Sequence, residues 1–162
     1  LSPSLSTPQV MPIWLIEYFG ARDLEQVFLF IALMTAPFWI AMIAFSNAKA
    51  VRKVAQPFIV APLYCIVLFV LLWKAYEASI LPEPTIEATY HSARDFAEHP
   101  MAFLVLFCND QILNLFLGTM IYQKAIKCGF RAPVELLLCG CFGAIALVPF
   151  SIRLILRRRV TQ

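Results

Sequence analysis

The sequence predicts an all-α, polytopic membrane protein, a bundle of four transmembrane helices, and three observations support this. Of the 162 residues, 61% are hydrophobic and only 14% are charged, whereas a soluble domain carries roughly 25% charged residues. Four apolar stretches have about the length, roughly 17–25 residues, with which a helix crosses a bilayer. These stretches lack the strict alternation of barrel strands, and in hydrocarbon only helices and closed barrels satisfy the backbone.

Residues 1–23 are expected to form an extended or interfacial segment before the bundle. The chain begins LSPSLSTPQV without an initiator Met, so it is expected to be the mature end of a processed precursor or a chain whose start is missing. The stretch MPIWLIEYFG (11–20) is apolar and aromatic but too short to span. It either lies in the membrane interface or packs over the helix ends.

The transmembrane domain is expected over residues 24–157, followed by a basic tail at residues 158–162. Its expected spans cover residues 27–45, 57–75, 100–122 and 134–156. Three of them contain a proline, which removes a backbone donor and is expected to kink the helix. These prolines are Pro37, Pro62 and Pro149.

The charges between the spans are unevenly distributed. Residues 46–56 and 123–133 form short basic loops without an acidic residue, whereas the long loop at 74–99 is rich in acids. The positive-inside rule places the basic loops on the cytoplasmic or stromal side. With four crossings, the basic C-terminal end would lie on the opposite side, with the acidic loop. Either this loop pairs with the tail, or one span is wrongly assigned.

The basic tail itself allows two interpretations. Arginines at a helix end can extend to the lipid headgroups and complement the helix dipole. Alternatively, they can bind anionic lipid or an acidic partner. The residues concerned are Arg157, Arg158 and Arg159.

The third span carries polar side chains at membrane depth, namely Asn109, Asp110, Gln111 and Asn114. Asp110, Asn114 and Gly118 recur every four residues and therefore share one stripe of the helix. Asp110 can form a hydrogen bond with Asn114 one turn later. An ionisable group at depth costs several kcal/mol, so we expect Asp110 to be buried between helices.

The fourth span offers small residues for close packing against Gly118, because their spacing is typical of membrane helix contacts. They are Gly140, Gly143 and Ala144. Two interpretations of the facing polar stripe remain open. It is either a clasp that fixes the packing of the third and fourth helices, or a site for a carotenoid hydroxyl or a chlorophyll magnesium.

Chlorophyll and carotenoid are therefore candidate cofactors, since Asn and Gln oxygens and His nitrogens can ligate magnesium. The candidate pigment-binding residues are Asn109, Gln111, Asn114 and His99. The alternative for His99, just before the third span, is an ordinary interfacial residue. Neither His91 nor His99 has a second ligand at metal spacing, so no protein-held metal site is expected.

Three stretches resemble a known family: APFWIAMIAF (36–45), NDQILNLFLGTMIYQKAI (109–126) and FGAIALVPFSIRLI (142–155). They are similar to the first, third and closing helices of small four-helix plastid membrane proteins of the "abscisic acid deficient" type, which are required for neoxanthin synthesis. The resemblance covers about residues 24–157. It implies a multi-pass protein of the plastid membrane, in the thylakoid, that acts on xanthophylls.

The chain departs from this family's third helix, which carries a His, an Asp five residues later and then an Arg or similar polar group. The matching positions hold Asn109, Asn114 and Thr119. General acid–base catalysis needs a titratable group, and amides cannot supply one. The resemblance therefore leaves Asp110, one position away, as the candidate acid.

Two functions follow. The first expectation is a non-catalytic accessory subunit of a thylakoid photosynthetic complex, which packs its many aromatic side chains against pigments and larger subunits. The alternative is a carotenoid-modifying protein, an isomerase that forms neoxanthin from violaxanthin, with Asp110 as acid and Asn114 as substrate clamp. Expected partners are membrane lipids, pigments and other subunits. Nucleic acid is excluded, because the net charge is only +3 and no basic face alternates with aromatics.

Overall fold

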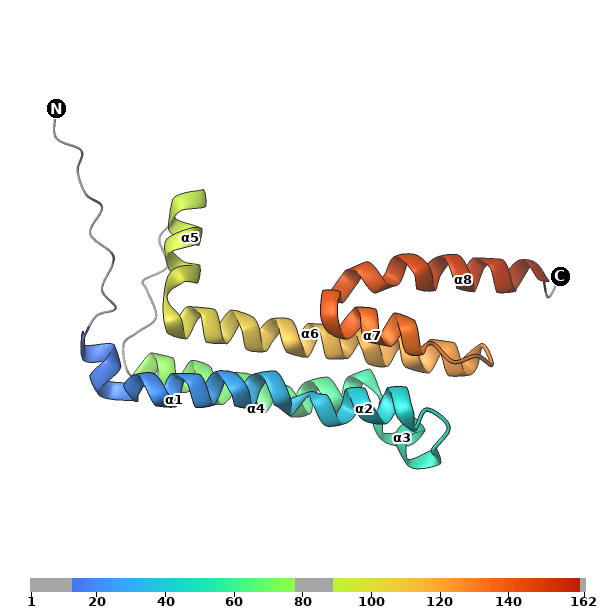
Figure 1. Cartoon of the computed structure of the whole chain (residues 1–162), viewed down its shortest axis with the longest axis horizontal. Coiled ribbons are helices and arrows are strands. Elements are labelled where there is room, and N and C mark those ends of the chain that lie inside the picture. The colour runs from blue at the N-terminus through green and yellow to red at the C-terminus, as the bar shows by residue number, and fades with distance from the viewer. Residues whose placement is uncertain (1–12, 78–88, 161–162) are drawn as a thin grey trace.

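The computed structural model describes residues 13–77 and 89–160, and within them every regular element is a helix (Figure 1). The helices are α1 (Ile13–Met34), α2 (Ala36–Ala44), α3 (Lys49–Val54), α4 (Pro57–Glu77), α5 (Tyr90–Glu98), α6 (Pro100–Lys127), α7 (Pro133–Phe142), the short 3₁₀ helix η1 (Gly143–Ala146) and α8 (Leu147–Val160). Residues 1–12, and residues 78–88 in the middle of the acidic loop, lie outside the described part.

Four helical stretches are long and apolar enough to cross a membrane, which confirms the predicted class of fold. They are Leu24–Ala44, Pro57–Lys74, Pro100–Lys127 and Pro133–Arg157. The N-terminal helix α1 begins at Ile13, so it already includes most of the short aromatic stretch at 11–20.

The first stretch breaks into α1 and α2 at Thr35, because Pro37 cannot donate to the preceding turn. The amide of Phe38 bonds the carbonyl of Thr35 instead of that of Met34. The freed Met34 oxygen accepts a hydrogen bond from the Tyr64 hydroxyl on α4 at 2.5 Å. A neighbouring helix thus satisfies a carbonyl group that the helix break leaves free, as hydrocarbon requires.

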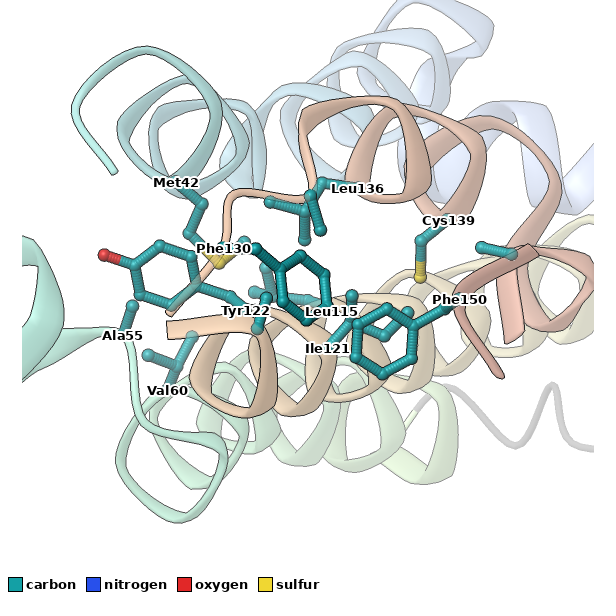
Figure 2. Packing of buried hydrophobic residues seen from close by; sticks show 13 residues of the cluster. Met42, Ala55, Val60, Leu115, Ile121, Tyr122, Phe130, Leu136, Cys139 and Phe150 are labelled. Atoms are coloured by element: carbon teal, nitrogen blue, oxygen red, sulfur yellow. The ribbon is translucent and has the colours of Figure 1, made fainter. Parts of the chain in front are cut away.

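The central element is α6, whose 28 residues contact α1, α2, α4, α5 and α7. Two hydrophobic clusters lie along it. The cluster towards α5 includes Ile31, Leu104 and Cys108. The cluster towards the other end joins α2, α4, α6, α7 and α8, and Figure 2 shows its residues interlocking around Leu115 and Tyr122.

The fourth apolar stretch is bent back on itself. Figure 1 shows α7 running along α6 from its C-terminal end, and α8 returning over α7 to the same end. The turn is η1, which begins at Gly143 with φ of 63°. Arg153 bonds Glu135 at 2.9 Å, although 18 residues separate them; a straight helix would hold them about 27 Å apart.

This hairpin changes the position of the basic tail. Four straight crossings would put the C-terminal arginines beside the acidic loop. Instead, the Arg157 guanidinium donates to the Cys128 carbonyl at 3.2 Å and lies over the Phe130 ring, both in the α6–α7 turn. The end of α8, with Arg157, therefore lies at the end of the bundle that carries the two basic loops. We call this end the basic end.

Candidate functional site

The α1–α2 break, the turn of the α7–α8 hairpin and the polar side chains of α6 lie at one level, halfway along α6. Asn114 lies near the middle of α6. Beside it lies the turn of the α7–α8 hairpin, where a Cβ on Gly143 would come within 2.6 Å of Asn114 Oδ1. The break between α1 and α2 reaches the same level, because the Thr35 hydroxyl donates to Gln111 Oε1 at 3.4 Å. Broken helices that meet polar groups at membrane depth are typical of functional sites.

Asp110 and Asn114 form a hydrogen-bonded pair within this layer. The Asn114 amide donates to Asp110 Oδ2 at 3.1 Å, one helical turn apart. The position of Asn114 is further fixed by its backbone, since its carbonyl accepts from the Cys139 thiol at 3.4 Å. Asp110 is the one carboxylic acid in the sequence of α6. The pair thus combines one titratable group with one fixed amide.

The expectation that Asp110 lies buried between helices is wrong, because its side chain is exposed. The reason is the hairpin. A straight fourth helix would continue alongside α6 past Asp110, but α7 ends at Phe142, next to Asn114. The carboxylate therefore lies just beyond the hairpin turn and faces the surroundings of the bundle at membrane depth.

Two of the predicted small residues, Gly118 of the stripe and Gly140 of α7, pack against one aromatic ring, that of Trp39 on α2. A Cβ on Gly118 would approach Trp39 Cζ3 to 2.7 Å, and one on Gly140 would lie 3.6 Å from Trp39 Cδ2. The ring therefore packs against glycines of both α6 and α7. Gly143 forms the hairpin turn, whereas Ala144 is exposed. The neighbour that approaches Gly118 most closely is the indole ring.

Other predicted residues lie apart from the Asp110–Asn114 pair. His99 caps the N-terminus of α6, about 15 Å along the helix from Asn109. Burial lowers the pKa of the His99 imidazole, whose Nδ1 has no hydrogen-bond partner in the described structure. Asn109 is exposed, and the buried Thr119 donates to the carbonyl of Phe116 in its own helix. The arginines Arg157, Arg158 and Arg159 lie at the basic end, the side chains of the last two outside the described part.

The sequence interpretation missed several residues that shape this layer. Thr35 and Trp39 carry no motif, and only their place beside Pro37 marks them as part of a helix break. Glu135 was missed as well, although it is a carboxylate in an apolar stretch. It is 5% exposed and paired with Arg153. An acid and a base at opposite ends of one apolar stretch can be the signal of a hairpin.

The Asp110–Asn114 pair can do two things chemically. A carboxylic acid can give a proton to, or take one from, a ligand that approaches through the lipid. The neighbouring amide can hold a hydroxyl or epoxide oxygen of that ligand in place. Within residues 13–77 and 89–160, no group of three His, Cys, Asp or Glu side chains is placed to hold a metal ion.

Comparison with known proteins identifies the family. The sequence model of the ABA4-like family, described as ABA DEFICIENT 4-like, matches residues 26–150, most of the chain. No curated protein and no solved structure matches. The match favours the expectation of a role in neoxanthin synthesis and gives no support to that of a photosynthetic accessory subunit. The chain belongs to the ABA4-like family of plastid-associated membrane proteins.

Proposed function

We propose that this protein forms neoxanthin from violaxanthin in the thylakoid membrane, with the Asp110–Asn114 pair as its reactive site. The family match supports the substrate class. The observation that carries the site is the exposed Asp110 carboxyl group at membrane depth, bonded to Asn114 next to the hairpin turn. A carotenoid dissolves in the bilayer, so a site that opens sideways to lipid suits its approach.

The reaction is an isomerisation, so it needs neither an oxidant nor a reductant. One C–O bond of an epoxide breaks, its oxygen gains a proton, and a carbon of the polyene chain loses one to form the new double bond. Asp110 first donates the proton to the epoxide oxygen, and its carboxylate then accepts the proton from carbon. Such general acid–base catalysis contributes roughly 10²–10⁴-fold to a rate.

The amide of Asn114 holds the ring oxygen of the substrate near Asp110. Asn114 suits this role because the Cys139 thiol and the hairpin turn fix its position. Asn109 and Thr119 stand where the family has ionisable groups, and neither can transfer protons at neutral pH. Asp110 therefore carries the acid–base chemistry alone.

The test is the pigment content of a host that accumulates violaxanthin and makes no neoxanthin. Expression of the wild-type chain is expected to produce neoxanthin, measured by chromatography. Asp110→Asn keeps the size and removes the proton, so neoxanthin formation should fall about 100-fold or more. Asp95→Asn makes the same change on the exposed face of α5 and should have no effect. Unchanged neoxanthin formation with Asp110→Asn would reject the proposal.

A further inference from the structure

A second site is hollowed into the basic end of the bundle, well away from Asp110. A cavity of about 310 Å³ lies between the ends of α2, α3 and α6, the α6–α7 turn and the start of α7. Its apolar wall includes Met42, Phe130 and Leu136, which belong to the buried cluster in Figure 2. Its polar rim includes Ser46, Arg52 and Arg131. The cavity lining thus combines apolar side chains with two cationic residues.

Ser46 supplies an unused hydrogen-bonding group in this cavity. The residue is only 7% exposed, and its Oγ has no partner in the described structure. Its backbone is held in place, since the Tyr122 hydroxyl donates to the Ser46 carbonyl at 2.8 Å. Burial of a hydroxyl without a partner is unfavourable, and such a group in a native cavity calls for an explanation. A ligand that accepts from the hydroxyl provides one.

The two arginines come from different segments, Arg52 from α3 and Arg131 from the α6–α7 turn, and the backbone of Arg52 is held against α6. The Gln123 amide on α6 donates to the carbonyls of Arg52 and Ala55, at 3.0 and 2.7 Å, and so fixes the end of α3 against α6. In the described structure, neither Arg52 nor Arg131 pairs with a carboxylate. Both arginines line the same cavity and are exposed, and guanidinium groups bind phosphate and sulfonate groups well.

The size and position of the cavity narrow the ligand class. Its volume lies at the lower end of the roughly 300–1,000 Å³ typical of ligand sites, which suits a headgroup better than a whole two-ring carotenoid. It opens at the end of the spanning helices, where lipid headgroups lie. The apolar wall of Met42, Phe130 and Leu136 accommodates the apolar part just below a headgroup.

We infer that this cavity binds a tetrahedral oxyanion, the phosphate or sulfonate group of an anionic membrane lipid, through Arg52, Arg131 and the Ser46 hydroxyl. The arginines bind the charge, and the hydroxyl donates to an oxygen of the anion. The apolar wall adds contacts that a free ion cannot make, so the lipid is the preferred source. This site is separate from the proposed reactive pair and does not depend on its function.

Native mass spectrometry of the full chain, released from mixed bilayers of phosphatidylcholine and phosphatidylglycerol, tests the inference. The wild type is expected to retain one phosphatidylglycerol in preference to phosphatidylcholine. Arg52→Gln with Arg131→Gln should reduce this retention about tenfold or more. The matched control, Lys53→Gln with Lys127→Gln, removes the same charge from outside the cavity and should retain the lipid. Equal loss in both double variants would mean diffuse surface charge and would overturn the site.

Ser46→Ala gives an independent readout, because its effects should have opposite signs with and without lipid. In neutral bilayers it removes an unpartnered hydroxyl, so the midpoint of thermal unfolding should stay or rise. With phosphatidylglycerol, the stabilisation that the wild type gains should shrink. A second arm adds inorganic phosphate to protein in neutral bilayers. Stabilisation by phosphate but not by phosphatidylglycerol would assign the site to the free ion, and stabilisation by neither would overturn the inference.

Discussion

Trp39 explains why a glycine stands at position 118, where the sequence spacing indicated only that the residue is small. The indole ring lies against Gly118 of α6 and Gly140 of α7, and so joins three segments one helical turn from Asn114, towards the basic end. The two glycines differ in the room they leave. At Gly118 even a methyl group would overlap the ring, whereas at Gly140 it would make an ordinary van der Waals contact.

This difference predicts opposite outcomes for the same substitution. Gly118→Ala should destabilise the protein by about 1–3 kcal/mol, the usual cost of overpacking. Gly140→Ala should be neutral or slightly stabilising, because alanine favours the helix over glycine. Unfolding by denaturant in detergent micelles measures both. Trp39→Phe in the Gly118→Ala background should recover part of the loss, and equal effects of the two glycine substitutions would contradict the ring contact.

The residues of the site were predictable only in part. Asp110 and Asn114 are four residues apart, so helix geometry predicts that they share one face. In the structure a hydrogen bond joins the pair. The exposure of Asp110 was not predictable, because it depends on where α7 stops. Thr35 and Trp39 were missed for a related reason: their roles exist only once the helix break brings them against α6.

Among the elements, the α7–α8 hairpin depends on a charged pair inside an apolar stretch. Glu135 is in the first turn of α7, where the helix dipole favours a negative charge. It is almost fully buried, and Arg153 of α8 bonds one of its oxygens while lying 4.7 Å from the centre of the Phe130 ring. The pair therefore connects the two arms of the hairpin close to its open end.

Replacing Arg153 should destabilise the protein more than replacing Glu135. Arg153→Met leaves the buried Glu135 carboxylate without its partner, which should cost about 3 kcal/mol, the lower end for a buried pair. We take the lower end because the Arg153 side chain is 43% exposed. Glu135→Gln should cost less, about 1 kcal/mol, because the remaining arginine can turn to water. Denaturant unfolding in micelles measures both, and a larger loss with Glu135→Gln would contradict this account.

A matched control is available on α5. Arg94 bonds Glu98 at 2.7 Å, but both side chains are more than half exposed. Arg94→Met should therefore leave the unfolding midpoint unchanged, because exposed ion pairs contribute little.

The elements differ in how far hydropathy could predict them. Hydropathy located α4 and α6 well, because length and composition decide whether a straight helix crosses a bilayer. Hydropathy found the fourth stretch too, but not its path. The path depends on the positive φ at Gly143 and on the ion pair between Glu135 and Arg153. Hydropathy, which only adds up apolar residues, contains neither. One sequence signal did argue against a straight fourth crossing: such a crossing would place the basic C-terminal end on the same side as the acidic loop.

For the whole molecule, the hairpin brings the described arginines of α8 to the end that already carries the basic groups of both short loops. They are Lys49, Arg52, Lys53, Lys124, Lys127, Arg131, Arg153 and Arg157. The positive-inside rule then places this end on the stromal or cytoplasmic side without the conflict that four straight crossings create. The ten residues of α7 extend about 15 Å, half of a hydrocarbon core of about 30 Å, so we predict that the hairpin enters and leaves on one side.

This topology predicts which positions a membrane-impermeant maleimide labels together in sealed vesicles. The test uses single cysteines in a cysteine-free background: the native Cys128 in the α6–α7 turn, Arg157→Cys near the end of α8, and His91→Cys on α5 at the opposite end. Positions 128 and 157 should react from the same side, and position 91 only from the other. A straight fourth crossing would instead pair position 157 with position 91. That result would contradict the hairpin and, with it, the exposure of Asp110 on which the proposed chemistry depends.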